Sequence, residues 1–318
     1  NNAGNLIATA IEVSGNEIPS SYFMNTESGK LIQNAIEGRA SISGFDTFTN
    51  KGLIETDALL TIDNIGSFNN LTDNLSDLDT AARIVSESGV KISNTDSFNN
   101  SAILVADALS ITSNTFNNSG ILGAGEAVID IKQDQLINSG RIYQSDLVAN
   151  EQSRDQVNTL NNEFIIQANG LTNSESASIE LALGRIDLQG GDLVNKGLIR
   201  ELDKENVTSQ LSIENVKHLE NYNDLSVSTD LLIAESGSIS NIGENSYIKA
   251  NTIAGTGLSH VNNEGALLAN ETIELNSQSI NNSENADIFA KTISFNASSF
   301  TNNSRIGSEQ AIEIYSTS

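Results

Sequence analysis

The sequence predicts an all-β fold, a β-solenoid in which coils of about 20 residues stack on one another. Two observations predict it: an apolar residue followed two places later by asparagine returns at regular intervals, and short runs alternate apolar with polar residues. The segment 116–135 shows both, because Phe116 precedes Asn118 and because Ile129 and Ile131 stand on either side of a polar residue. Alternation with period two is typical of a strand that buries one face, and no such run has the period of a helix.

The first half of each coil carries the apolar anchor and its asparagine. This pair occurs fourteen times at a mean spacing of about 21 residues, which indicates a repeat architecture. The chain opens inside the pattern, since Asn2 and Gly4 match Asn118 and Gly120, so we expect residue 1 to be a cut within a coil. The anchors are Phe23, Phe48, Phe68, Phe98, Phe116, Leu136, Leu160, Leu171, Leu193, Leu219, Ile239, Val261, Ile280 and Phe300.

The second half of each coil carries a triplet whose outer members are large and apolar and whose middle member is polar. A strand with one face on a core and the other in water requires this order. The middle residues therefore point outward in this interpretation. They are Glu12, Thr61, Ser110, Asp130, Asp187, Ser212, Glu274, Ser294 and Glu313.

The recurring asparagines are expected to form a structural ladder. At a corner between two sheets, each side-chain amide can bond to the amides of the coils above and below. Asparagine also tolerates the left-handed backbone that a corner can require, and the glycine that often stands two places later, as at Gly120, suits a tight bend. The predicted ladder comprises Asn50, Asn100, Asn118, Asn138, Asn173, Asn195, Asn221, Asn241, Asn263, Asn282 and Asn302.

We expect one continuous domain over residues 1–318, because a solenoid coil contacts only its neighbours and sets no limit on length. Where coils are longer than usual, the excess should form polar loops near 16–24, 71–82, 144–158 and 200–209. The chain has no cysteine, which excludes a disulfide framework and a cysteine-based zinc site. Stability therefore has to come from hydrogen-bonded sheets and rows of apolar side chains.

The charge balance argues against two classes of partner. The formal net charge is -25, with 41 acidic against 16 basic residues, and such a surface repels nucleic-acid phosphates and anionic lipid headgroups. No apolar run approaches the roughly 18 residues that a membrane-spanning helix needs. We therefore expect neither nucleic-acid binding nor membrane insertion.

The insertions are the candidate binding surface. In repeat proteins such segments often carry recognition, with tolerated surface variation as the alternative. The segment 16–24 holds the only proline and two adjacent aromatic residues, and the segment 71–82 holds leucines among acidic residues. The candidate receptor-binding residues are Pro19, Tyr22, Asp73, Leu75, Asp77, Leu78 and Asp79.

The sequence offers no convincing metal or catalytic site. Asp73, Asp77 and Asp79 lack the residue order and the distal glutamate of a calcium-binding EF-hand loop. His218 and His260 should lie two coils and roughly 10 Å apart, which is too far to share a metal ion. The outward triplet residues scatter, whereas catalysis requires convergent groups. We therefore expect no enzyme activity and no cofactor, with a carbohydrate-active enzyme or phage-type depolymerase as the alternative.

The pattern Phe/Leu-x-Asn-x-Gly-x-Ile/Leu-x-Ala followed by apolar-x-apolar, as in 116–131 and 98–111, resembles the haemagglutinin repeat of filamentous haemagglutinin and related two-partner secretion exoproteins. The resemblance covers nearly the whole chain. The sequence departs from the pattern at the four insertions, in the 11-residue gap between Leu160 and Leu171, and where no glycine follows the asparagine, as at Asn100.

The resemblance implies a right-handed parallel β-helix in a large bacterial exoprotein that is threaded through an outer-membrane two-partner transporter and folds outside the cell. It implies a non-catalytic shaft, secreted or displayed on the surface of a Gram-negative bacterium, that serves host-cell adhesion or contact-dependent delivery of a toxin. The expected partner is a protein or glycan receptor on a target bacterium or host cell. The insertions suit a specific receptor, which favours the delivery stalk slightly over the adhesin.

Overall fold

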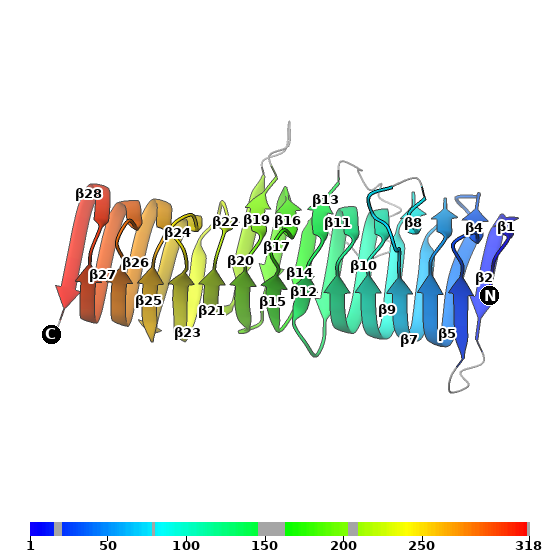
Figure 1. Cartoon of the computed structure of the whole chain (residues 1–318), viewed down its shortest axis with the longest axis horizontal. Coiled ribbons are helices and arrows are strands. Elements are labelled where there is room, and N and C mark those ends of the chain that lie inside the picture. Colours follow the sequence, from blue (N-terminus) through cyan, green and yellow to red (C-terminus); the bar gives the residue numbers. More distant parts are fainter. Residues whose placement is uncertain (16–20, 78–79, 146–162, 203–208, 317–318) are drawn as a thin grey trace. The chain divides into compact units, whose positions relative to one another are not determined.

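The computed structural model describes residues 1–15, 21–77, 80–145, 163–202 and 209–316. Its contacts divide the chain into two units, Asn1–Ile166 and Gln167–Ser318. All regular structure in the described residues is β-strand (Figure 1), so the predicted all-β class is confirmed. Because this part of the chain holds no helix, it also holds none with the length and apolar character of a membrane span.

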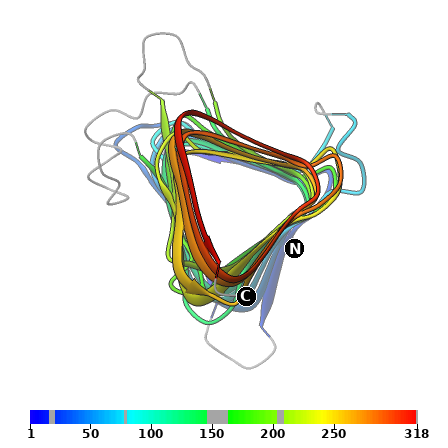
Figure 2. The same ribbon diagram turned by 90° about the vertical axis from the view of Figure 1, so that its left-hand side faces the viewer.

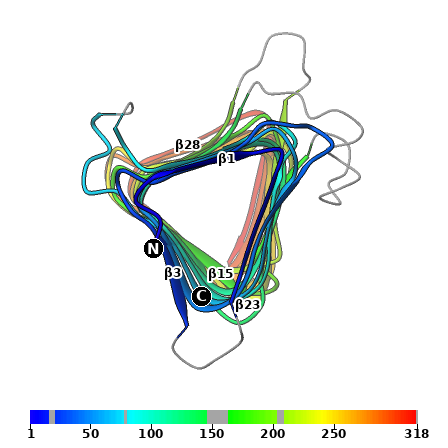
Figure 3. The same cartoon turned by 90° about the vertical axis from the view of Figure 1, so that its right-hand side faces the viewer.

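Each coil of the first unit is three-sided, as Figure 3 shows for the N-terminal coils. We name the sides the first, second and third faces, in the order in which the chain follows them after a ladder asparagine. The first face contains β1 (Asn5–Ala8), β4 (Lys30–Gln33), β6 (Leu53–Thr56), β8 (Arg83–Ser86), the starts of β10 (Ile103–Asn118) and β11 (Ile121–Ile131), and β13 (Arg141–Gln144). The second contains β2 (Ala10–Ser14), the starts of β5 (Arg39–Asn50), β7 (Leu60–Asn70) and β9 (Val90–Asn100), the middle of β10, the end of β11, and β14 (Phe164–Gln167). The third contains β3 (Tyr22–Asn25), the ends of β5, β7, β9 and β10, and β12 (Leu136–Asn138).

The second unit repeats the three-sided coil, as Figure 2 shows for the C-terminal coils. Its first face contains β16 (Ser178–Leu181), β19 (Leu198–Glu201), β22 (Asp224–Ser226) and the starts of β24 (Tyr247–Leu258), β26 (Ala266–Asn282), β27 (Asp287–Asn302) and β28 (Arg305–Ser316). The second contains β17 (Leu183–Asp187), β20 (Gln210–Glu214), the start of β23 (Leu231–Asn241) and the middle or end of β24, β26, β27 and β28. The third contains β15 (Gly170–Asn173), β18 (Asp192–Asn195), β21 (Val216–Asn221), the end of β23, β25 (His260–Asn263) and the ends of β26 and β27.

Strands of successive coils pair in parallel, which is the defining feature of a β-helix. In the first unit Phe68 of β7 lies beside Phe98 of β9. The pairing of these two strands keeps the same register from Leu60 to Asn70. In the second unit Ile273 of β26 lies beside Ile293 of β27. The predicted β-solenoid is therefore confirmed within each unit.

The core is a column of apolar side chains, as the anchors predict. Phe48, Phe68, Phe98 and Phe116 are all at most 1% exposed and stack with ring centroids 5.5, 5.1 and 4.7 Å apart. Stacked rings bury a large apolar area and favour this offset separation. In the second unit, aliphatic anchors such as Leu219 form a row of their own. Each coil thus adds one anchor to the row of its unit, beside the buried residues of its other strands.

The prediction that the ladder asparagines need a left-handed backbone at their corner is wrong. No described ladder asparagine has a positive φ. Left-handed residues such as Asn64, with φ 54°, and Asn94, with φ 50°, lie between the second and third faces, at a different corner. The ladder position therefore selects asparagine for its amide and not for its backbone.

Close approach of the neighbouring coil, and not a left-handed turn, explains the glycines that follow the ladder. A Cβ added at Gly120 would lie 2.1 Å from the carbonyl oxygen of Ala102, and one added at Gly140 would lie 2.1 Å from that of Gly120. Among the glycines of this type in the described residues, only Gly243 has a positive φ, of 93°. At Gly120 and Gly140 the backbones of successive coils therefore lie too close together for a side chain at the glycine position.

Parts of the expected loops belong to strands. Residues 22–24 lie in β3, Gln144 ends β13, and Arg200 and Glu201 lie in β19, because they follow the register of the neighbouring coil. Residues 71–77 and 80–82 do form a non-strand excursion after β7. Ser21, Ser145, Leu202 and Ser209 are described and lie outside the strands, whereas 16–20, 78–79, 146–158 and 203–208 lie outside the described residues.

Candidate functional site

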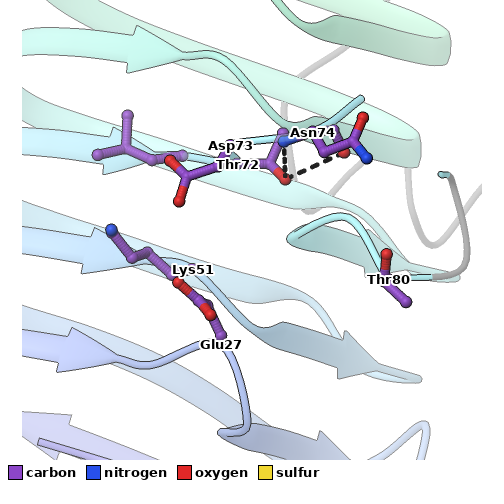
Figure 4. A pocket seen from close by; sticks show the side chains of 7 residues that line it. Glu27, Lys51, Thr72, Asp73, Asn74 and Thr80 are labelled. Carbon is purple, nitrogen blue, oxygen red and sulfur yellow. Dashed lines mark hydrogen bonds between the residues drawn. The ribbon is translucent and has the colours of Figure 1, made fainter. Parts of the chain in front are cut away.

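A polar pocket opens in the first unit at the corner between the third and first faces (Figure 4). Its volume is about 300 Å³. It lies where the insertion 71–82 leaves the coil directly after Asn70. The lining residues are Glu27, Lys51, Leu71, Thr72, Asp73, Asn74 and Thr80.

The asparagine ladder fixes the floor of this corner. The Nδ2 of Asn25 donates to the Oδ1 of Asn50 at 2.8 Å, Asn50 donates to Asn70 at 2.9 Å, and Asn70 donates to Asn100 at 2.8 Å. The column therefore continues past the insertion without interruption. Because each of these amides is buried and bonded, the turns that follow them start from rigid points.

Backbone hydrogen bonds carry this register into the pocket wall. The amide nitrogen of Lys51 donates to the carbonyl oxygen of Asn25 at 2.7 Å, and that of Leu71 donates to the carbonyl oxygen of Asn50 at 2.8 Å. Lys51 and Leu71 therefore follow the ladder in equivalent places on adjacent coils. The insertion therefore departs from the register of the neighbouring coil only after Leu71.

The insertion has local order of its own. The amide nitrogen of Asn74 donates to the hydroxyl of Thr72 at 3.4 Å, and the amide nitrogen of Ser76 donates to the Oδ1 of Asn74 at 2.9 Å. The amide nitrogen of Ala81 donates to the carbonyl oxygen of Asp77 at 2.9 Å, and Ala81 is 5% exposed. Such side-chain-to-backbone bonds stabilise turns without a helix or strand.

Among the described residues, three charged side chains line the pocket. Glu27 and Lys51 lie on one wall and Asp73 on the opposite wall, with Thr80 at one end (Figure 4). Within the part of the chain that the structure describes, no hydrogen bond or ion pair engages the side-chain charges of these three residues. The pocket can therefore offer one ammonium and two carboxylate groups to a ligand.

The predicted receptor-binding residues do not form one site. Asp73 lines the pocket, Leu75 is half-buried beside it and Asp77 is exposed further along the insertion. Tyr22, 62% exposed, begins β3 at the far end of the third face, roughly 15 Å from the pocket at the usual rise per residue. Pro19, Leu78 and Asp79 lie outside the described residues.

The sequence prediction names one pocket residue, Asp73, as a contact and misses two others altogether. Thr72, Asn74 and Thr80 belong to the predicted binding segment 71–82 without being named as contacts, whereas Glu27 and Lys51 lie outside every predicted segment. The register of the repeat could have identified Lys51 as a neighbour of the insertion. Lys51 directly follows the ladder residue Asn50, as Leu71 follows Asn70, so the two lie at the same corner one coil apart. Applying that register to the residues around an insertion would identify its neighbours.

The described asparagines of the predicted ladder all lie in hydrogen-bonded columns. In the first unit Asn100 donates to Asn118 and Asn118 to Asn138, both at 2.8 Å. In the second unit each amide donates to the next at 2.8 to 2.9 Å. That column comprises Asn173, Asn195, Asn221, Asn241, Asn263, Asn282 and Asn302. Asn2, Asn25 and Asn70 belong to the first column as well.

No metal-binding cluster of three or more His, Asp or Glu side chains occurs in the described ranges. The histidines occupy equivalent places on the third face, two coils apart, with Ser238 between them in the register. The Nδ1 of His218 lies 3.0 Å from the hydroxyl of Ser238, and the Nε2 of His260 lies 3.4 Å from that of Ser240. Each imidazole is thus engaged with a serine of an adjacent coil.

The comparisons with known proteins give no match: no family model, no curated protein and no solved structure is similar to this chain.

Proposed function

We propose that this chain is a non-catalytic stalk section of a large bacterial exoprotein, and that it binds a receptor on a target bacterium or host cell through the insertion pocket. In this proposal the exoprotein reaches the surface of a Gram-negative cell through an outer-membrane two-partner transporter. It then serves contact-dependent toxin delivery or adhesion. The regular β-helical coils supply the stalk, and the insertion supplies the recognition.

One observation carries the proposal: the insertion lines a pocket with Thr72, Asp73, Asn74 and Thr80, none of which is buried in the core of the coil. The ladder bonds from Asn50 to Asn70 and from Asn70 to Asn100 have the same length as bonds elsewhere in the column. A segment that the fold does not need, but that closes a pocket of about 300 Å³, is a candidate for binding.

The regular surface supports the same assignment. On the third face of the first unit, successive coils present similar small polar side chains, such as Ser67 and Ser97, whose hydroxyls lie 3.0 Å apart. A partner that recognises such a surface at one level meets nearly the same groups at the next. Specific recognition therefore needs a departure from the repeat, and the insertion provides one.

A deletion tests the proposal without disturbing the coil. Removal of residues 72–81 joins Asn70 and Leu71 to Ala82 and Arg83, which reproduces the register of Asn100-Ser101-Ala102-Ile103 one coil later. Ala82 is 2% exposed and stays in place as part of the core. We expect this variant to keep its circular-dichroism spectrum and to melt within a few degrees of the parent.

Binding of labelled protein to Gram-negative bacteria and to epithelial cells, measured by flow cytometry, gives the functional readout. The deletion should abolish binding, and Tyr22→Ala, which removes an exposed aromatic group, should weaken it. Leu232→Ala is the matched control, because Leu232 is 56% exposed on the second unit and far from the insertion in sequence. Full binding by the folded deletion variant would exclude the insertion as the receptor site.

Genes next to the coding sequence separate the two roles within the proposal. A transporter gene together with a small immunity gene favours toxin delivery, whereas a transporter gene alone favours adhesion.

A further inference from the structure

The insertion pocket combines charges of both signs with an excess of negative charge. Lys51 is half-buried, whereas Glu27 and Asp73 are exposed at the rim. One ammonium faces two carboxylates, and the whole chain carries a formal charge of -25. Both the local and the overall field therefore attract a cationic ligand and repel an anionic one.

The neutral groups of the pocket indicate a ligand rich in hydroxyls. Thr80 contributes a hydroxyl and Asn74 an amide, whose oxygen is held by Ser76 while its nitrogen faces no described acceptor. Among the described residues no aromatic side chain lines the pocket, and Leu71 is the one aliphatic member. A wall of this kind binds through hydrogen bonds and not through burial of a large apolar group.

The size of the pocket limits the ligand. A volume of about 300 Å³ lies at the lower end of the range for small-molecule sites. It suits one or two sugar rings. A flexible lysine side chain of a protein partner would satisfy the carboxylates but would leave Asn74 and Thr80 without partners, and it would fill little of the volume.

We infer that the pocket binds an amino sugar, a hydroxylated ring that carries a free ammonium group. The ammonium lies between the carboxylates of Glu27 and Asp73. Ring hydroxyls accept from the amide of Asn74 and from the ammonium of Lys51, and they exchange hydrogen bonds with Thr80. This inference rests on the proposed function, because it names the ligand of the receptor-binding pocket.

Calorimetric titration of the whole chain with two dimers that share their sugar rings and differ at the amino groups tests the inference. At about pH 6 the dimer of glucosamine is cationic, whereas the dimer of N-acetylglucosamine has the same rings and no charge. We expect the glucosamine dimer to bind more tightly by up to about 25-fold, since each of two exposed ion pairs contributes at most about fivefold. The difference should shrink as salt is added.

Substitutions of the charged pocket residues test which side chains cause the preference for the charged dimer. Asp73→Asn and Glu27→Gln should each weaken binding of the glucosamine dimer by about three- to fivefold. Lys51→Met removes a like charge and should increase the preference for the charged dimer over the acetylated one. Glu55→Gln is the matched control, because Glu55 is an exposed carboxylate of the same unit that does not line the pocket, and it should change nothing.

The outcomes separate this inference from the proposed function. Equal affinity for the two dimers, binding to neither, or tighter binding of a lysine amide than of the glucosamine dimer would overturn the amino-sugar assignment. If the deletion of 72–81 still abolished cell binding, the pocket would remain a receptor site for another ligand. Conversely, charge-dependent binding of glucosamine in a protein whose deletion variant still binds cells would support the ligand and contradict the receptor role.

Discussion

The side-chain amide of Asn100 donates to the Oδ1 of Asn118 at 2.8 Å, one coil further along the first unit. Both side chains are 1% exposed. The same amide also donates to the carbonyl oxygen of Ile121 at 3.2 Å, so one asparagine satisfies a neighbouring side chain and the backbone of a turn. A buried amide with these partners cannot be replaced by an apolar group without leaving several polar atoms unpaired.

The ladder predicts different costs for two adjacent asparagines. Asn118→Leu should lower the free energy of unfolding by about 1 to 3 kcal/mol, because the buried bonds to Asn100 and Asn138 are lost. Asn117→Leu should cost less than about 0.5 kcal/mol, since Asn117 is exposed and donates to Asn99 on the outer surface. Urea denaturation measures both values, and similar costs would mean that the inner column does not stabilise the coils.

The phenylalanine column predicts a large cost for a cavity. Phe98→Ala should destabilise the protein by about 3 to 5 kcal/mol, because Phe98 is fully buried between Phe68 and Phe116 and the gap cannot collapse. Phe289→Ala is the control, since Phe289 is 38% exposed and lies over Gly307 on the outer surface, and it should cost about 1 kcal/mol or less. A small loss of stability for Phe98→Ala would contradict close packing of the column.

Thr56 is expected to destabilise the core. It is 3% exposed, its hydroxyl has no hydrogen-bond partner, and it lines a small cavity beside Leu31 and Leu60. Thr56→Val keeps the shape and removes the unpaired group, so the free energy of unfolding should rise by about 1 kcal/mol.

Ser86 is the matched control for Thr56, because the two residues occupy the same place on adjacent coils. Its hydroxyl donates to the carbonyl oxygen of Gly89 at 2.7 Å, so Ser86→Ala should lower stability by about 1 kcal/mol. Thermal denaturation should therefore shift in opposite directions for the two variants. A shift in the same direction would mean that the Thr56 hydroxyl finds a partner in solution.

We expect the stability of the protein to depend on pH through the carboxyl group of Asp107. Burial, and then the negative charge of Glu87 on the adjacent coil, raise the pKa of the Asp107 carboxyl above its usual value. The folded chain therefore holds this proton more tightly than the unfolded chain, so the site's contribution to stability falls as pH rises through that range and stays unfavourable at neutral pH. Asp107→Asn should raise the melting temperature at pH 7 and change it little below about pH 3, where both states are protonated.

A second variant identifies the cause of the Asp107 effect. In a Glu87→Gln background the like charge is absent, so Asp107→Asn should raise the melting temperature by a smaller amount than in the parent. An unchanged gain would assign the whole effect to burial. No gain at pH 7 in either background would contradict the raised pKa.

The sequence by itself determined the coil. The apolar anchors and alternating triplets specify which side chains face inward, because a strand offers only two faces and a shift of one residue would exchange them. For the same reason the inward asparagine, two places after each anchor, had to meet its equivalent on the next coil. Phe98 and Asn100 therefore lie where the pattern predicts, above Phe116 and Asn118.

Only the tertiary structure decided the site. Glu27, Lys51 and Asp73 lie far apart in the sequence and meet because three successive coils place their turns at one corner. Tyr22 and Asp73, which the sequence groups as candidate receptor contacts, lie at opposite ends of a face. The repeat encodes the register of the strands, but the pocket depends on the path of an insertion outside that register, and local composition does not specify that path.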